Sequence, residues 1–515
     1  MSRINTNVQS LIAQRVLNQN NNSLNTSLER LSTGLRINRG KDDPAGLIAS
    51  ENLRKEMTAT TSAIGNAERA DQVVNIAEGG LQEVSGLLTE LQGLLTTSAN
   101  TAGLSDAEKA ANQLQVDSIL QTIDRIAGAT SFQGTKLLNG NFDYQTDNVA
   151  ASVETYRVNG AKLDGNDLNV DVIVTQSAQQ AGLFLSLGGG IDLGGAQGST
   201  FTIEITGALG SRELSFASGT SLADVVNTIN TFTEVTGVEA AVGTGSGSGG
   251  VTLRSDKYGS DQFVRVQIVS DANFTATNAG SGIFNFEATD TNAIDGATVR
   301  AFNSTAASNG VRDAGQDIAA TINGVQATAR GRTIRVNTDF LDVEMTIAAA
   351  QATQRGSIQA FDITAGGADF QLAGQVDIAG KVSLGIQDVS TRKLGRFDTS
   401  GEGNFRRLDD LGSGKSLNVV DGDLSNAQNV VASAIEEVSS LRGRLGAFQR
   451  NTIGATIRSL NIGLENTNAA NSVIRDTDFA SETASLTRGQ ILSAAATNTL
   501  SLANSQPQAV LQLLG

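Results

Sequence analysis

The chain lacks three residue types that carry much of protein chemistry, because it has no histidine, no cysteine and no tryptophan. Without histidine there is no imidazole acid or base near neutral pH, and without cysteine there is no thiolate nucleophile. The nitrogen and sulfur ligands of zinc sites are missing for the same reason. Only carboxylates, serine, lysine and tyrosine remain for catalysis, so we expect no enzyme, no metal site and no cofactor.

Positive charge and long apolar runs are also scarce. The chain has 37 Lys and Arg against 53 Asp and Glu, a net charge of -16, which disfavours nucleic acid and anionic membranes as partners. Residues 1–17 lack the apolar core of a cleavable signal peptide, and no stretch is long enough for membrane insertion. Composition alone favours the cytoplasm, and export would need a route without such a signal.

Both ends of the chain have the apolar spacing of long helices, and the prolines, Pro44 and Pro507, leave long stretches uninterrupted. Leucines separated by 7, 4, 3 and 4 residues form a coiled-coil seam: Leu17, Leu24, Leu28, Leu31 and Leu35. A second seam follows in Val74, Ala77, Leu81, Val84, Leu88, Leu91 and Leu95. Ser105 and Glu108 then have the spacing of a capping box that starts another helix.

The C-terminal end repeats this character from about Leu424. One stripe contains Val431, Ile435, Val438, Leu441, Leu445 and Phe448, and the last stretch carries Ile491, Leu492, Ala495, Ala496, Leu500 and Ala503. Such seams serve either packing inside one subunit or assembly between subunits, and composition does not choose between the two.

The interior has a different pattern, with apolar residues at every second position. Examples are Leu168/Val170/Val172/Val174, Phe201/Ile203/Ile205, Val264/Val266/Ile268 and Leu341/Val343/Met345/Ile347. This alternation predicts half-buried strands, and Ser221 with Asp224 predicts one short helix among them. The expected fold class is therefore a multidomain α+β protein, mainly α at both paired termini, with an inserted, mainly-β region.

Each end of the chain carries a long, specific motif. The stretch from Leu31 to Gly46 reads LSTGLRINRGKDDPAG and includes Gly34, Arg36, Asn38, Asp42 and Asp43. The far end reads NAANSVIRDTDFA over residues 468–480 and QPQAVL over 506–511. These motifs resemble the terminal regions of bacterial flagellins. Residues 130–138 resemble the family's turn into a hairpin, and residues 320–325 are similar to a short Ile-Asn-Gly motif of flagellin and hook-protein inserts.

The resemblance implies three domains. Residues 1–43 with 475–515 would form an inner coiled coil, and residues 44–176 with 424–474 a helical shell with a β-hairpin. Residues 177–423 would form outer, surface-exposed, β-rich domains.

The resemblance also implies a function: a secreted structural subunit of the bacterial flagellar filament, exported unfolded through a type III apparatus and polymerised into the propeller for swimming. Its partners would be further copies of itself, an export chaperone, a filament cap and hook–filament junction proteins. Two other readings stay open, namely a junction protein of the same superfamily, or an adhesin or hydrolase that uses the β-rich region.

Two motifs invite a chemical reading. Asp42 and Asp43 are adjacent carboxylates, but Pro44 disfavours helix for the residue before it, and Asp often caps helices, so we expect a hinge between helices here. The segment Gly412–Ser416 resembles a phosphate-binding loop but has Asp409 where that motif needs glycine, so we expect a surface loop.

A third stretch concerns immune recognition. Flagellins recognised by the animal Toll-like receptor usually carry a Gln-Arg-x-Arg-Glu-Leu-type sequence, whereas this chain has Glu90, Gln92 and Gly93 in the corresponding region. The change reverses one positive charge and removes another, so we expect weak receptor recognition.

Overall fold

The structure is a computed structural model that describes residues 6–100, 103–163, 165–193, 200–245, 248–272, 281–287, 293–398 and 405–514. The chain divides into two compact units. Unit 1 contains residues 1–75, 370–382 and 443–515, and unit 2 contains residues 76–369 and 383–442.

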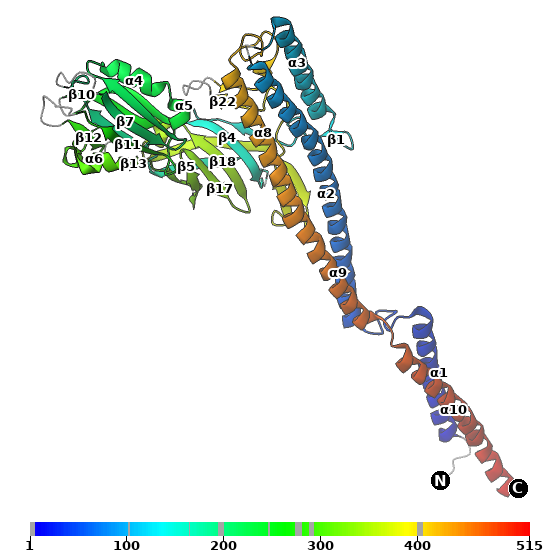
Figure 1. The fold of residues 1–515 in the computed structure, drawn as a ribbon. Helices are drawn as coiled ribbons and strands as arrows, with labels where there is room; N and C mark the ends of the chain where they lie inside the picture. Colours follow the sequence, from blue (N-terminus) through cyan, green and yellow to red (C-terminus); the bar gives the residue numbers. More distant parts are fainter. Residues whose placement is uncertain are drawn as a thin grey trace. The chain divides into compact units, whose positions relative to one another are not determined.

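Long helices form both ends of the chain, as the spacing predicted (Figure 1). The N-terminal ones are α1 (Val8–Thr33), α2 (Pro44–Ser98) and α3 (Asp106–Ala129). The C-terminal ones are α8 (Leu424–Ala447), η3 (Phe448–Ile453), α9 (Gly454–Arg475) and α10 (Phe479–Leu514). The predicted capping box is confirmed, because the Ser105 hydroxyl accepts from the N–H of Glu108 while the Glu108 carboxylate accepts from the N–H of Ser105.

The predicted seam on α2 is also confirmed. Apart from Val73, its buried side chains follow steps of four and three from Ala63 to Ser98, and they include every member of the predicted run from Val74 to Leu95. On α8 the predicted stripe is buried as well, except that Ile435 is half-buried. The sequence therefore located both helical walls and the faces that they bury.

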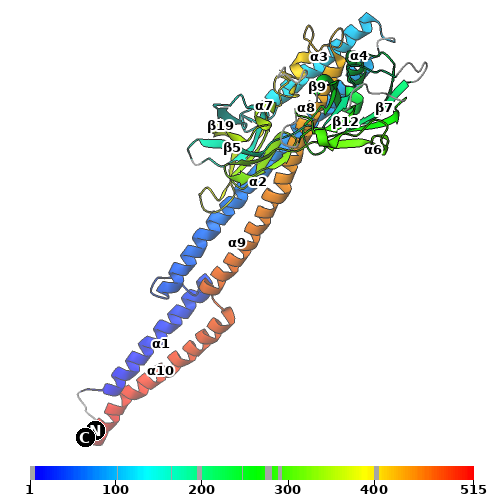
Figure 2. The ribbon, with the colours of Figure 1, turned by 90° about the vertical axis from the view of Figure 1, so that its left-hand side faces the viewer.

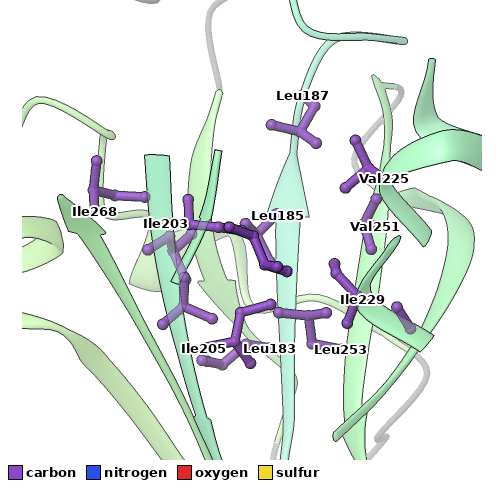
Figure 3. Packing of buried hydrophobic residues seen from close by; sticks show 14 of the residues in the cluster. Leu183, Leu185, Leu187, Ile203, Ile205, Val225, Ile229, Val251, Leu253 and Ile268 are labelled. Carbon is purple, nitrogen blue, oxygen red and sulfur yellow. The ribbon is translucent and has the colours of Figure 1, made fainter. Parts of the chain in front are cut away.

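Two β modules lie in unit 2. The first combines the sheets β12-β6-β10-β9 and β13-β11-β7-β8. Its strands are β6 (Gly182–Ser186), β7 (Thr200–Gly207), β8 (Ser211–Ala217), β9 (Val238–Gly245), β10 (Ser248–Ser255), β11 (Phe263–Ser270), β12 (Gly282–Asn285) and β13 (Val311–Ala314). Its helices are α4 (Leu222–Asn230), α5 (Thr233–Thr236), η1 (Gly296–Thr298) and α6 (Thr305–Asn309). Figure 3 shows part of its core, in which leucines of β6 meet isoleucines of β7 and side chains of α4 and β10.

The second β module combines the sheets β15-β14-β5-β19-β3 and β16-β17-β18-β4 around its own core. Its strands are β3 (Tyr144–Asp147), β4 (Val153–Ala161), β5 (Leu168–Gln176), β14 (Ala319–Ile322), β15 (Val325–Gln326), β16 (Thr328–Arg330), β17 (Thr333–Asn337), β18 (Leu341–Ile347) and β19 (Gly356–Gly366), with the short helix α7 (Ala349–Ala352). Strands that precede the first module in the sequence (β3 to β5) and strands that follow it (β14 to β19) thus share one core.

Short elements complete the chain. They are β1 (Ser131–Phe132), β2 (Thr135–Lys136), β20 (Ala368–Gln371), β21 (Lys381–Leu384), β22 (Phe397–Asp398), β23 (Phe405–Arg406) and η2 (Leu408–Leu411). The four alternating segments predicted as strands are confirmed in β5, β7, β11 and β18, and the short helix predicted at Ser221 is α4. The fold class is therefore the predicted multidomain α+β class, with helical ends and a β-rich middle. The three-domain boundaries remain a prediction.

Candidate assembly interface

The two terminal helices, α1 and α10, lie side by side and run in opposite directions (Figure 2). Three contacts set their register: Asn7 Nδ2 to the Ala503 carbonyl at 2.8 Å, Asn20 Nδ2 to the Leu492 carbonyl at 3.3 Å, and Arg30 to Glu482 at 3.6 Å. Residue numbers on α10 fall as those on α1 rise. The first and last helices of the chain therefore form one antiparallel pair.

The seam of this pair is built mostly from small side chains. Its buried and half-buried positions follow steps of three and four, namely Ser10, Ala13, Leu17, Asn20, Leu24, Ser27, Leu31 and Gly34 on α1, and Glu482, Leu486, Gly489, Ser493, Ala496, Leu500 and Ala503 on α10. This is the repeat of a coiled coil. The predicted seam residues Leu24, Leu31 and Leu500 lie in it and are half-buried.

Two other predicted seam residues lie outside it. Leu28 is 46% exposed and Ile491 is 65% exposed. Ile491 lies between Gly489 and Ser493, and so occupies the side of α10 that points away from α1. Further large apolar side chains are exposed on the same two helices: Val8, Leu11, Ile12, Val16, Phe479, Leu492 and Leu502. Within one subunit the pair therefore leaves apolar surface uncovered.

Gly34 and Arg36 lie where the segment after α1 contacts the segment between α9 and α10. Gly34 ends α1 in the left-handed conformation (φ 74°), which glycine adopts without strain, and its carbonyl accepts from the N–H of Thr477 at 2.9 Å. The N–H of Arg36 donates to the carbonyl of Arg475 at 2.7 Å. Residues 34–36 and 475–477 thus form a short antiparallel bridge, and the Arg36 guanidinium adds bonds to the carbonyl of Ile474.

Asn38, Asp42 and Asp43 shape the turn into α2. The Asp42 carboxylate accepts from the N–H of Arg39 at 2.8 Å and of Asn38 at 3.2 Å, and these bonds, the one from Arg39 foremost, lower the pKa of Asp42 below its usual value. Asp43 accepts from the N–H of Gly46 at 2.8 Å, at the start of α2. Asp43 thus caps the start of α2, and Asp42 stabilises the turn before it, while the hinge between helices remains a prediction.

The remaining predicted residues lie on the surface. Glu90 and Gly93 are exposed and Gln92 is half-buried on α2, which continues through Gly93 to Ser98. In the segment Gly412–Ser416, Lys415 pairs with Asp409 at 3.2 Å, and the N–H of Ser413 donates to Asp117 at 2.9 Å. The described part of the chain holds no cluster of three metal-ligating side chains, and none of its helices is long and apolar enough to cross a membrane.

Sequence reasoning missed the polar part of the α1–α10 seam. The Ser10 hydroxyl donates to the Asn504 side chain at 2.7 Å, and the Ser493 hydroxyl donates to Asn21 at 3.0 Å. A search for leucine and isoleucine does not find such positions. A heptad scan that also accepts Ala, Ser, Gly and Asn would have found them.

An antiparallel pair of terminal helices, long helical walls and inserted β modules define a structural protein built for assembly. Residues 4–143 match the family model of the bacterial flagellin N-terminal helical region, residues 429–514 the bacterial flagellin C-terminal helical region, and residues 200–257 the flagellin hook IN motif. This last match lies away from residues 320–325, where the sequence suggested such a motif.

Curated relatives match along the whole chain. B-type flagellin of Pseudomonas aeruginosa is 30% identical and flagellin of Salmonella typhimurium 28% identical, each over 99% of both chains. The solved structure of FliC from Burkholderia pseudomallei matches 74% of this chain and 99% of its own, at 14% identity and a TM-score of 0.22. The chain belongs to the bacterial flagellin family. It is a structural subunit of the flagellar filament, an extracellular component of the bacterial flagellum.

Proposed function

We propose that α1 and α10 are the polymerising part of this subunit, and that neighbouring copies cover the apolar side chains which the pair leaves exposed. The observation that carries the proposal is the exposure of Leu28 and Ile491 on helices whose own seam is built mostly from small side chains. Full burial of one such side chain contributes roughly 1.5–3 kcal/mol. Summed over the exposed apolar side chains of both helices, this free energy offsets the conformational entropy that is lost when the chain ends become ordered.

The small apolar area that the seam buries also suggests when these helices become ordered. Helix pairs that bury little apolar surface are marginal alone, because most helical stability in proteins comes from packing. We infer that α1 and α10 are largely unfolded in the free subunit and order on assembly. This agrees with export in the unfolded state through a type III apparatus.

The three-domain division belongs to the same proposal, with an inner coiled coil (1–43, 475–515), a helical shell (44–176, 424–474) and outer domains (177–423). The proposed partners are further copies of the chain, an export chaperone that holds the C-terminal helix, a filament cap, and hook–filament junction proteins. We propose no catalytic role, since the chain has no histidine or cysteine.

Seeded polymerisation of the purified full-length protein tests the proposal. Removal of residues 475–515 should abolish filament growth while the β modules stay folded by circular dichroism. A sharper test is Ile491→Ser, with Asn498→Ser as its control, because position 498 is also exposed and lies one heptad further along α10. Growth should slow at least tenfold only for Ile491→Ser, and equal growth of both variants would refute the assembly role.

The same assay separates a filament subunit from a hook–filament junction protein. A filament subunit adds to its own seeds without limit, so filament length should increase with subunit concentration. Addition that stops after a few layers would favour the junction protein.

We also propose weak recognition by the Toll-like receptor, because Glu90 and Gln92 on α2 replace the basic residues of the recognised sequence. A cell reporter assay with purified monomer tests this. The triple variant Glu90→Arg, Gln92→Arg and Gly93→Glu should raise potency well above that of the unmodified protein. Equal potency of the two proteins would contradict the proposal.

A further inference from the structure

The long C-terminal helix is irregular at one place in unit 1. Between α8 and α9, η3 is a π-helix, in which the N–H of Gly454 donates to the carbonyl of Gln449, five residues back. A π turn holds more residues than an α turn, and such bulges are rare in proteins. The helix therefore accommodates an extra residue within 448–453.

The buried positions show the effect of this extra residue. Along α8 they keep steps of four and three through Ala434, Val438, Leu441, Leu445 and Phe448. The next buried side chain, Ile453, comes five residues later. In an α-helix these two side chains would differ by about 140° around the axis. The wider π turn brings both to the buried side.

On the partner helix α2, buried positions at steps of four and three continue from Ala63 to Ser98, and Val73 is buried in addition, beside Val74. The two helices thus carry repeats of different phase. The π turn at 448–453 absorbs the difference.

Contacts on two sides hold the π turn at this position. Gln449 Nε2 donates to Asp71 Oδ1 and to Asn75 Oδ1, both at 2.9 Å, and Asn75 Nδ2 donates to Asp71 Oδ2 at 3.0 Å. The Phe448 ring lies 6.0 Å from the ring of Phe370. One polar cluster and one aromatic contact therefore fix the extra residue in place.

We propose that the π turn of η3 migrates along the helix, and that this migration shifts α9 by one residue along α2. We call η3 a slip joint in this sense. The shift breaks few backbone hydrogen bonds, since a π turn that migrates exchanges one set of carbonyl acceptors for the next. The hydrogen bonds of the Gln449–Asp71–Asn75 cluster hold the π turn at one position, and we call this cluster the latch. The subunit thereby gains two registers of α9 against α2 without unfolding the helix.

Deletion of one residue tests whether η3 stores an extra residue. Deletion of Asn451, which is exposed in η3, should convert the π turn into an α turn and leave α9 in register. Deletion of the exposed Ser459 in the regular helix α9 should instead rotate everything beyond it by about 100°. We expect the thermal midpoint of full-length protein to change by less than 2 °C for the first deletion and to fall by more than 5 °C for the second. Equal losses would overturn the proposal.

Substitution of the latch tests whether the joint moves. In the unmodified protein, amide exchange should be faster at residues 448–454 than in flanking turns. Gln449→Ala should extend the fast-exchanging stretch into α9 by at least one turn, whereas Arg450→Ala, at an exposed neighbouring position, should not. A fast stretch of unchanged length in Gln449→Ala would overturn the slip joint. Neither substitution touches α1 or α10, so failure here leaves the polymerisation proposal standing.

Discussion

Gln113 and Val419 are joined by a hydrogen bond of 2.8 Å, from the N–H of Val419 to Oε1 of Gln113. The same side chain donates from Nε2 to the carbonyl of Leu411 at 3.0 Å, and Gln113 is only 4% exposed. Both ends of one buried amide therefore bind backbone groups on either side of the segment Gly412–Ser416. The segment that resembles a phosphate-binding loop is a loop fastened to α3.

Replacement of Gln113 by leucine should lower the free energy of unfolding of unit 2 by about 1–3 kcal/mol, because buried backbone groups lose their partner. Urea denaturation followed by circular dichroism measures the change. Gln121→Leu, at an exposed position of α3, is the control and should stay within about 0.5 kcal/mol of the unmodified protein. A similar small change for Gln113→Leu would show that this clamp is not stabilising.

Two glycines of α2 should respond in opposite directions to alanine. A Cβ on Gly46 would lie 2.5 Å from Asp43 Oδ2 and 2.7 Å from Ile37 Cδ1, whereas one on Gly65 meets no atom within 4 Å. Gly46→Ala should therefore destabilise the turn before α2, while Gly65→Ala should stabilise the helix by up to about 1 kcal/mol. Thermal unfolding of both variants checks the prediction, and stabilisation by Gly46→Ala would contradict the close packing.

Glu437 should make stability fall as pH rises. Its burial raises the pKa of the carboxyl above the usual value, although the N–H of Gly395, at 3.0 Å, acts against this. A group with a raised pKa in the folded state stabilises fully below the unfolded pKa of about 4.3, and this contribution is lost as pH rises through the folded pKa. Glu437→Gln should therefore raise the thermal midpoint at pH 8 and leave it nearly unchanged at pH 4. Glu436→Gln, at the exposed neighbour, should change neither, and an unchanged midpoint of Glu437→Gln at pH 8 would refute the prediction.

Asp317 should have the opposite dependence. Burial alone would raise the pKa of its carboxyl, but bonds from the hydroxyl and N–H of Ser260 and from the N–H of Gly331, at 2.6 Å, lower it overall. The stability it contributes is present above the unfolded pKa of about 3.9 and is lost as pH falls through the folded pKa. Asp317→Asn should lower the thermal midpoint at pH 7, and the deficit should shrink towards pH 3. The exposed Asp256→Asn serves as control, and a deficit independent of pH would contradict this assignment.

The elements that the sequence predicted best are those whose spacing is set by burial on one face. Val170, Val172 and Val174 alternate because one side of β5 faces a core, and the capping box at Ser105 depends only on local geometry. The α1–α10 seam was harder to predict, because positions such as Ser27 and Gly489 are selected for size rather than for hydrophobicity. The π turn was missed because the step from Phe448 to Ile453 fits no regular helix.

The antiparallel pairing of α1 and α10 also sets an order of events. Asn7 and Ala503 are separated by 496 positions along the chain, so both β modules are synthesised after α1 and before its partner helix. α1 therefore leaves the ribosome without the helix that it pairs with. The β modules can fold during this interval, and α1 cannot pair until it is over.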